Sequence, residues 1–207
     1  MHCPEHLIIF TRFPLAGQAK TRLIPHLGAA GAADLQRRMT EHTIAQAREL
    51  ASRQPLNTEV LFTSGNRGQM AGWLGPELRY RAQGSGDLGQ RQARAFDRAF
   101  QAGAERVIVI GADCPDLTAD LLQLAFRWLK ETDLVLGPAR DGGYYLIGLR
   151  MPAPALLAEI PWSTKAVLAT VLTKAARLEI PFRLLKPLHD IDRPADLGHW
   201  HPFTKAE

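Results

Sequence analysis

Cysteine is scarce in this chain of 207 residues, which contains only Cys3 and Cys114. Two cysteines so far apart provide neither a disulfide framework nor the paired spacing of a zinc site. A reducing, cytoplasmic environment is the simplest expectation, and we expect Cys114 to be a buried structural thiol.

Long apolar runs are also missing, since none approaches the roughly 18 residues that a membrane span requires. The first residues lack the charged and apolar regions of a signal peptide, and we find no internal repeat. Runs of lysine and arginine interleaved with aromatic residues, which are typical of nucleic-acid binding, are absent as well. We therefore expect no membrane span and no nucleic-acid partner.

The charges that are present leave a small positive balance, because 25 lysines and arginines oppose 21 acidic residues to give +4. A mildly basic chain is suited to an anionic ligand such as a nucleotide. With 46% hydrophobic residues the chain can bury a sizeable core, and its length suits one domain over residues 1–207.

Strand and helix patterns alternate along the chain, which predicts an α/β fold. The expected strands cover residues 6–11, 58–64, 78–83, 107–110, 133–137, 146–149 and 181–188. The expected helices cover residues 29–53, 69–74, 90–102, 119–131 and 165–179, the last with Ser163 or Thr164 as its N-cap.

The organising feature of the sequence is Val107–Ile110, four consecutive β-branched residues that predict a strand buried on both faces. Pro115 stops this strand, and Thr118 is the expected N-cap of the following helix. Asp113 therefore lies at the carboxyl end of a central strand, where open α/β sheets bind ligands. Its carboxylate could hold a metal ion, hold a sugar hydroxyl or cap a loop, and Asp116 could be a solvated turn residue.

A basic loop follows the first expected strand and contains Arg12, Lys20 and Arg22 with no acidic residue among them. These cations, and the backbone N–H groups near Gly17, would suit the phosphates of a nucleotide. The loop lacks the glycine positions of a P-loop, so it would bind phosphate in a different way. A solvated basic loop without a ligand is the alternative.

The stretch Gly84–Gly89 matches G-x-G-x-x-G, with a strand predicted before it and a helix after it. An acidic residue, Asp113, follows downstream, so a dinucleotide-binding fingerprint has to be considered. The preceding strand is polar and alternating, however, and the match does not lie in the first β-α-β unit. A glycine-rich ligand loop or a tight turn is therefore the better interpretation.

A further candidate segment contains Asp141, Gly142 and Gly143, followed by Tyr144 and Tyr145. Aspartate followed by two glycines is typical of a hairpin turn. Two tyrosines that can stack or form hydrogen bonds would also suit a wall that contacts substrate.

A second acidic pair, Asp190 and Asp192, follows the last expected strand. Residues i and i+2 of an extended chain point the same way, so both carboxylates could face one cleft. The structural alternative makes Asp192 the N-cap of a final helix with Pro194 in its first turn. Two separated carboxylates can hold Mg²⁺ or Mn²⁺ and leave sites open for phosphate and water.

Five motifs together resemble a bacterial family of small GT-A transferases, often labelled arsenosugar-biosynthesis-type glycosyltransferases. That family resembles in turn the nucleotidyltransferases, including the molybdenum-cofactor and phospholactate guanylyltransferases. The resemblance extends from Leu7 to Leu197. Its motifs are FTRFP…KTRL (10–23), GDLGQR (86–91), GADCPDL (111–117), DGGYYLIG (141–148) and DIDRPADL (190–197).

The resemblance implies a GT-A, Rossmann-like three-layer α/β/α sandwich with a mixed, mostly parallel sheet. It also implies that Asp113 and Asp192 hold the metal, with Asp190 in reserve. The residues over which the nucleotide would lie are Arg12, Lys20, Arg22, Gly86, Asp87, Leu88 and Gly89. The residues that would face the acceptor or the donor sugar are Asp141, Gly143 and Tyr144. Glycosyltransferases of this fold carry D-x-D, whereas Asp113 and Asp116 form D-x-x-D.

Three functions are open at this point. The first is a metal-dependent glycosyltransferase that uses a nucleotide-sugar. The second is a guanylyltransferase-like nucleotidyltransferase that releases pyrophosphate, and the third is a nucleotide-binding domain without catalysis. The partners would be a nucleotide or nucleotide-sugar and a small-molecule acceptor, with a homodimer left open. The expected catalytic residues are Asp113, Lys20, Arg22 and Asp141.

Overall fold

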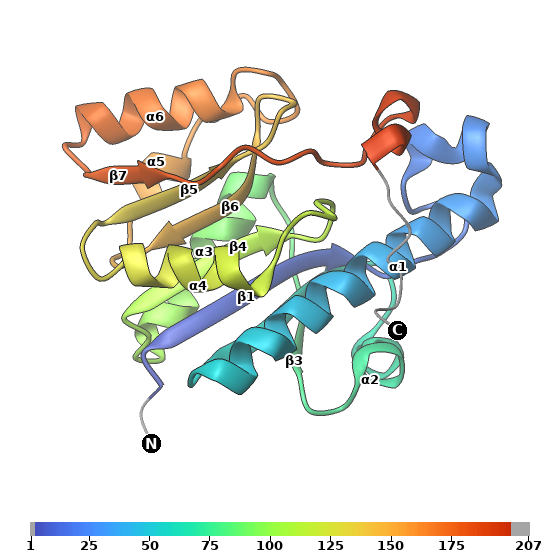
Figure 1. Cartoon of the computed structure of the whole chain (residues 1–207), viewed down its shortest axis with the longest axis horizontal. Coiled ribbons are helices and arrows are strands. Elements are labelled where there is room, and N and C mark those ends of the chain that lie inside the picture. Colours follow the sequence, from blue (N-terminus) through green and yellow to red (C-terminus); the bar gives the residue numbers. More distant parts are fainter. Residues whose placement is uncertain (1–2, 200–207) are drawn as a thin grey trace.

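The computed structural model describes residues 3–199, which form one sheet flanked by helices (Figure 1). The strands are β1 (Glu5–Arg12), β2 (Asn57–Thr63), β3 (Arg79–Ala82), β4 (Arg106–Gly111), β5 (Leu134–Pro138), β6 (Tyr144–Leu149) and β7 (Phe182–Leu184). Their order is β3-β2-β1-β4-β6-β5-β7, and β6 is the strand that runs antiparallel to both of its neighbours. The sheet is therefore mixed and mostly parallel.

Helices cover both faces of this sheet. They are α1 (Ile24–Arg53), α2 (Arg67–Leu74), α3 (Leu88–Gln101), α4 (Ala119–Trp128), α5 (Pro154–Leu157) and α6 (Val167–Arg177), with short 3-10 helices η1 (Thr21–Leu23) and η2 (Pro194–His199). The first core cluster contains α1, α2 and α4, and the second contains α3, α5 and α6. This arrangement confirms the expected three-layer α/β/α sandwich. Within residues 3–199, no helix has both the length and the apolar character to cross a membrane.

Strand β4 is buried on both faces because each face of the sheet carries its own helical layer. Ile108 and Ile110 pack in the cluster that contains α1 and α4, whereas Val107 and Val109 pack in the cluster that contains α3 and α6. None of the four side chains is more than 2% exposed. A strand covered on both sides is apolar at every position, which explains the continuous apolar run.

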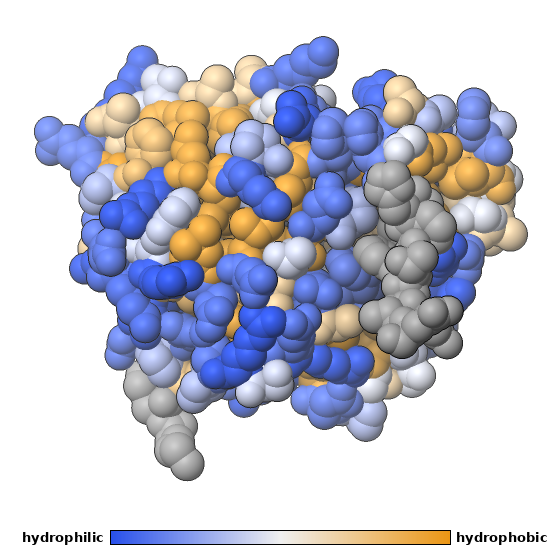
Figure 2. Space-filling view, viewed as in Figure 1, coloured by the Kyte–Doolittle hydropathy of each residue, from blue (hydrophilic) through white to orange (hydrophobic). Residues whose placement is uncertain are grey.

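The sheet edge formed by β7 is less well covered by helices than the central strand β4. Strand β7 is an edge strand, and Figure 2 shows apolar side chains gathered where α6 and β7 lie in this view. Leu178, Phe182 and Leu184 are between 39% and 45% exposed. The predicted strand 181–188 is shortened to β7, and Leu188 forms only an isolated bridge with Ala139.

The parallel strands bring their carboxyl ends to one edge of the sheet. The loops that follow β1, β2, β4 and β5 start at this edge, and the antiparallel β6 begins there. Segments that are distant in sequence therefore meet, as the position of Asp113 predicted. One such contact is a 2.9 Å hydrogen bond from the N–H of Ile191 to the carbonyl oxygen of Asp113.

The expected helix caps have different outcomes. Thr118 caps α4 as predicted, because its hydroxyl accepts a hydrogen bond from the first turn of that helix. The prediction that Ser163 or Thr164 caps α6 is wrong, since Ala166 occupies the N-cap position. Thr164 instead closes a local turn, in which its hydroxyl accepts a hydrogen bond from the N–H of Ala166 at 3.2 Å.

Truncation of the central strand should be costly. Ile108→Ala is expected to lower the free energy of unfolding by about 2–5 kcal/mol, because the side chain is fully buried and its removal leaves a cavity. Urea denaturation measures the change. Leu178→Ala, at a position that is 45% exposed, is the control and should cost less than about 0.5 kcal/mol. Similar losses in both variants would contradict the packing described above.

Candidate functional site

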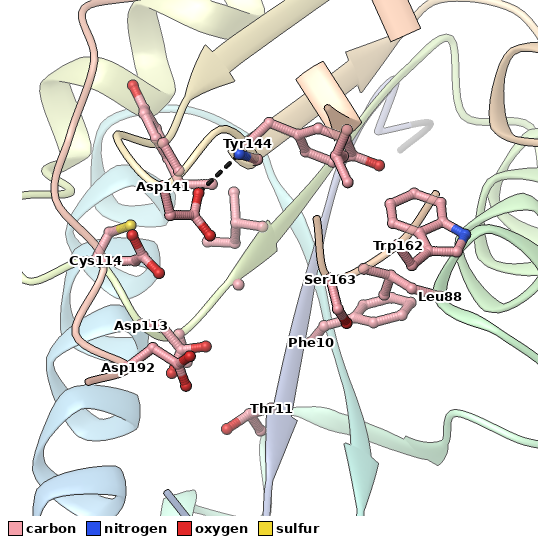
Figure 3. Close-up of a pocket in the computed structure, with 18 of the residues that line it drawn as sticks. Phe10, Thr11, Leu88, Asp113, Cys114, Asp141, Tyr144, Trp162, Ser163 and Asp192 are labelled. Atoms are coloured by element: carbon pink, nitrogen blue, oxygen red, sulfur yellow. Dashed lines mark hydrogen bonds between the residues drawn. The ribbon is translucent and has the colours of Figure 1, made fainter. Parts of the chain in front are cut away.

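A cleft of about 930 Å³ opens at the carboxyl edge of the sheet (Figure 3). Its walls come from the ends of β1, β2 and β4, the turn between β5 and β6, the start of α3 and the segments 162–167 and 190–196. Its volume is typical of small-molecule sites. The residues expected from sequence that line it are Arg12, Arg22, Leu88, Asp113, Asp141, Gly143, Tyr144, Asp190 and Asp192.

Figure 3 separates two parts of this cleft. The part that we name the acidic half contains Asp113, Cys114, Asp141 and Asp192, together with Asp190. The part that we name the apolar half contains Phe10, Leu88, Trp162 and Ser163. A ligand that fills both halves would have one charged end and one apolar end.

Several residues expected from sequence do not line the cleft. They are Gly17, Lys20, Gly86, Asp87 and Gly89, and Asp116 is also exposed outside the cleft.

The glycine-rich loop is the start of α3. The Asp87 carboxylate accepts a 2.8 Å hydrogen bond from the N–H of Gln90, whose side chain accepts one from the N–H of Asp87 at 3.3 Å. A Cβ on Gly89 would lie 2.3 Å from the carbonyl oxygen of Leu157, so glycine is required where α3 packs against α5. The glycine-rich loop therefore caps α3 and lets this helix pack closely against α5. Leu88 is the residue of the loop that lines the cleft.

Lys20 joins three segments beside the acidic half. Its ammonium donates hydrogen bonds to Oδ1 of Asp113 and to the carbonyl oxygen of Ile191, both at 2.5 Å. The Lys20 side chain is 4% exposed, whereas that of Asp113 is 49% exposed. Lys20 also has a left-handed backbone (φ 47°), a costly conformation that the surrounding structure must enforce. The lysine is therefore part of the fold, and the carboxylate faces the cleft.

Arg22 and Asp192 form a second ion pair, in which both side chains are substantially exposed. The turn before η2 is held by Asp196, whose carboxylate accepts hydrogen bonds from the N–H groups of Asp192 at 3.1 Å and Arg193 at 2.7 Å. The helix η2 begins at Pro194, as the structural alternative expected, but Asp192 lies two residues before it and its carboxylate contacts Arg22 instead of capping the helix. Asp190 and Asp192 both line the cleft, as the i, i+2 spacing predicted.

Asp190 lies among other carboxylates. Burial, followed by the negative charges of Asp141 and Asp113, raises the pKa of Asp190 to about 6. Burial and the same group of carboxylates raise the pKa of the Cys114 thiol well above its usual value. Cys114 is 5% exposed and stays a neutral thiol, which fits its expected structural role.

The acidic half offers carboxylate oxygens, which are the ligands that Mg²⁺ or Mn²⁺ prefers. Within residues 3–199, no three acidic, histidine or cysteine side chains are arranged as a complete metal cage. Mg²⁺ rarely needs one, because it is usually held by one or two carboxylates together with substrate phosphates and water. Burial contributes most to the raised pKa of Asp190 and the neighbouring carboxylates of Asp141 and Asp113 add to it, so a divalent cation bound here would lower the cost of the ionised carboxylate. The acidic half therefore fits such an ion.

The turn between β5 and β6 places Asp141 on the cleft wall. Its carboxylate accepts a 2.7 Å hydrogen bond from the N–H of Gly143, drawn as a dashed line in Figure 3. Gly142 has φ +97°, and a Cβ there would lie 2.4 Å from the carbonyl oxygen of Lys165. The N–H of Leu168 donates to the carbonyl oxygen of Gly142 at 2.9 Å. The turn is thus fixed against the segment that precedes α6.

Tyr144 shapes the same wall. Its hydroxyl donates a 2.6 Å hydrogen bond to the side-chain oxygen of Gln92, and its ring meets that of Trp162 edge-on at 6.2 Å between centroids. Burial raises the pKa of Tyr144 above its usual value, so the phenol stays neutral. Tyr144 therefore connects β6 to α3 and supports the cleft.

Several polar residues of the cleft wall were not predicted as site residues from the sequence, among them Gln36, Gln83, Arg91 and Ser163. Gln36 is 6% exposed, and its side-chain amide donates hydrogen bonds to two threonine hydroxyls. Its position on the apolar face of a helix was the sequence signal that could have marked it as a candidate residue. Arg91 belongs to the motif 86–91 and Gln83 ends the expected strand 78–83, but neither had an assigned role. Ser163 has a left-handed backbone (φ 64°) that local sequence does not reveal.

Comparison with known proteins identifies a family and two informative relatives. A family model described as "Uncharacterized protein conserved in bacteria (DUF2064)" matches residues 43–164. A curated phosphoenolpyruvate guanylyltransferase from Chloroflexus aggregans is 28% identical over 146 residues, which cover 66% of this chain and 68% of that protein. A crystal structure from Desulfovibrio desulfuricans G20, provisionally assigned as a nucleotide-diphospho-sugar transferase, matches with TM-score 0.90 and 30% identity, covering 100% of this chain and 90% of that one.

A more distant structure shares the fold. Glucosyl-3-phosphoglycerate synthase from Mycobacterium tuberculosis, solved with Mg²⁺ and UDP, matches with TM-score 0.57 and 12% identity over 93% of this chain and 73% of that one. The fold is therefore that of nucleotide-dependent transferases, as the family resemblance implied.

The partly buried position of Asp190 among other carboxylates predicts a pH-dependent stability. The pKa of Asp190 is higher in the folded protein than in the unfolded chain, so the unfolded chain releases this proton at a lower pH. The free energy of unfolding therefore falls as the pH rises toward about 6, where the carboxyl group of the folded protein ionises. In metal-free buffer, Asp190→Asn should raise the thermal unfolding temperature at pH 8 and change it little at pH 4.

Calorimetric scans from pH 4 to 8 measure this difference, with Asp116→Asn as the control at an exposed position outside the cleft. An equal stabilisation by Asp190→Asn at both ends of the pH range would show that the carboxylate is not under strain.

Proposed function

The chain belongs to the bacterial family DUF2064, and from this membership and the geometry of the cleft we propose that it is a metal-dependent transferase with a nucleotide donor. Family membership alone assigns no reaction, because one fold hosts many chemistries. The observation that carries the proposal is the meeting of a basic loop and several carboxylates in one cleft. Phosphates and the divalent cation that accompanies them need these two kinds of side chain close together.

The basic loop would hold the donor phosphates. Arg12 and Arg22 line the cleft, and Lys20 contacts Asp113 at its edge. Gly17 has φ +80° and lets the loop turn, so that Arg12 donates a 2.8 Å hydrogen bond to the carbonyl oxygen of Gln18. Guanidinium groups bind phosphate through paired N–H donors. Lys20 would share its ammonium between Asp113 and a phosphate oxygen once the nucleotide is bound.

Asp113 and Asp190 would hold Mg²⁺ or Mn²⁺. Oδ2 of Asp113 has no hydrogen-bond partner among the described residues, and Asp190 lies among repelling carboxylates. Asp192 is an alternative ligand, because only its Oδ2 contacts Arg22, just as only Oδ1 of Asp113 contacts Lys20. A bound ion would neutralise charge on the departing phosphate. The Mycobacterium tuberculosis synthase, solved with Mg²⁺ and UDP, supports this use of the fold.

The acceptor would lie against the turn that contains Asp141 and Gly143. One oxygen of Asp141 is held by the N–H of Gly143, and the other has no partner within residues 3–199. That oxygen could accept a proton from an attacking hydroxyl, as a general base does. Tyr144, fixed by Gln92, would limit the space available to the acceptor.

Glycosyl transfer from a nucleotide-sugar is the first candidate reaction. The acceptor oxygen would bond to the anomeric carbon while the bond from this carbon to the diphosphate oxygen breaks. The acceptor proton would pass to Asp141, and the nucleoside diphosphate would leave with the electron pair. Full-length similarity to the Desulfovibrio desulfuricans protein supports this candidate.

Nucleotidyl transfer is the second candidate reaction. The acceptor oxygen would attack the α-phosphorus of a nucleoside triphosphate, and pyrophosphate would leave. Similarity to the Chloroflexus aggregans guanylyltransferase supports it, and the three cations of the basic loop suit a departing pyrophosphate.

Product analysis separates these reactions. The protein is incubated with Mg²⁺, a set of nucleotide-sugars or nucleoside triphosphates, and small hydroxylated or phosphorylated acceptors. Phosphorus NMR then detects nucleoside diphosphate if a glycosyl group moves and pyrophosphate if a nucleotidyl group moves. Nucleotide binding without either product would favour the third possibility, a binding domain, and would contradict the proposed catalysis.

Asp113→Asn should abolish Mg²⁺-dependent nucleotide binding, with a loss of affinity of at least about tenfold. The amide keeps the size of the side chain but removes the charge that would attract the ion. Calorimetric titration of a nucleoside diphosphate with Mg²⁺ or with chelator measures the loss, and circular dichroism checks the fold. Asp116→Asn is the matched control. If Mg²⁺ still strengthens binding equally in Asp113→Asn, the metal assignment fails.

A further inference from the structure

The apolar half of the cleft suits a flat ring. Leu88 is 37% exposed there, and Trp162 and Ser163 lie on the same half in Figure 3. If the phosphates occupy the acidic half, the remaining part of a nucleotide that could fill the apolar half is its base.

Arg91 lies one helical turn after Leu88 and also lines the cleft. Its Nε–H donates to the carbonyl oxygen of Gly86 at 2.8 Å, and its Nη1 donates to Oε1 of Gln83 at 3.1 Å. The second N–H of Nη1 and both N–H groups of Nη2 have no partner among the described residues. The guanidinium is therefore held in one orientation while part of its donor capacity stays unused.

Gln83 is itself fixed in orientation. It is 8% exposed, and its Nε2 donates to the carbonyl oxygens of Thr11 and Leu61, both at 3.1 Å. These carbonyls belong to the neighbouring strands β1 and β2, so a flipped amide would lose two buried hydrogen bonds. Its oxygen therefore faces Arg91, and Gln83 acts as a positioning residue for the guanidinium.

We propose that Arg91 recognises the base of the donor and that this base is guanine, an inference that rests on the function proposed above. One unused N–H of Nη1 and one of Nη2 can together present parallel donors to two adjacent acceptors, since Nε is already engaged by Gly86. Guanine offers O6 and N7 as such a pair, the commonest specific arginine contact to a base.

The other bases suit this donor pattern less well. Adenine places an amino donor beside N7, and uracil places an N–H between its two carbonyl groups. Cytosine pairs N3 with O2, but O2 lies next to the ribose. Guanine is therefore the base that most fully satisfies Arg91.

Arg94 provides a matched control. It donates to the carbonyl oxygens of Gln83 at 3.4 Å and of Ser85, so it holds the same loop from the same helix. Unlike Arg91, it does not line the cleft. Removal of Arg94 loosens the loop and leaves the donors in the cleft unchanged, which separates base recognition from loop stability.

Isothermal titration calorimetry with GDP, ADP, UDP and CDP in the presence of Mg²⁺ tests the proposal. Nucleoside diphosphates are used because both candidate donor classes contain this unit. The wild type should bind GDP about 5- to 150-fold more tightly than the other three. Arg91→Ala should reduce GDP to the level of the others, whereas Arg94→Ala should keep the preference.

Two analogues test the acceptor pair directly. Inosine diphosphate keeps O6 and N7 and should bind nearly as well as GDP, whereas 7-deaza-GDP lacks N7 and should lose most of the preference. A preference for another base, or a GDP preference that survives Arg91→Ala, would overturn the proposal. An equal loss for all four nucleotides would do the same, because it would assign Arg91 to the phosphates.

Failure of this inference is distinguishable from failure of the proposed function. Binding of all four diphosphates without base preference would overturn the role of Arg91 alone. If no diphosphate binds the wild type at all, with or without Mg²⁺, the proposed function fails together with the inference.

Discussion

The bonds of the Lys20 ammonium are the contact on which the arrangement of the cleft depends. They tie the loop after β1 to the end of β4 through Asp113, and to the segment before η2 through the carbonyl oxygen of Ile191. A charge that is 4% exposed must be paired, and loss of either partner would leave the other uncompensated. The basic loop and the carboxylates are thus brought together by the fold itself before any ligand arrives.

The same pairing explains how so much negative charge can gather at one edge of a sheet. Lys20 and Arg22 each neutralise a carboxylate, whereas partial burial and neighbouring carboxylates raise the pKa of Asp190. Like charges close together weaken a fold and strengthen a cation site, so stability and metal affinity should oppose one another here. The apolar half contains no carboxylate among its labelled residues, and Arg91, one helical turn after Leu88, is held by the neutral acceptors of Gly86 and Gln83.

The fold was predictable because its signals are local. The run Val107–Ile110 reports burial on both faces, and Asp113 follows it at the strand end. The site was predictable only in part. Spacing alone could not show that Asp192 pairs with Arg22, that Asp190 lies among other carboxylates, or that Ser163 adopts a left-handed backbone. Such outcomes depend on contacts between distant segments, and the residues of the Lys20–Asp113 bond lie 93 positions apart.

The most direct test of a shared phosphate and metal site is the affinity for Mn²⁺ with and without GDP, measured by electron paramagnetic resonance of the free ion. Nucleotide phosphates should supply ligands to the ion and share the ammonium of Lys20 with Asp113, so Mn²⁺ should bind more tightly when GDP is present. Equal Mn²⁺ affinity with and without the nucleotide would contradict the proposal that the basic loop and the carboxylates serve one ligand.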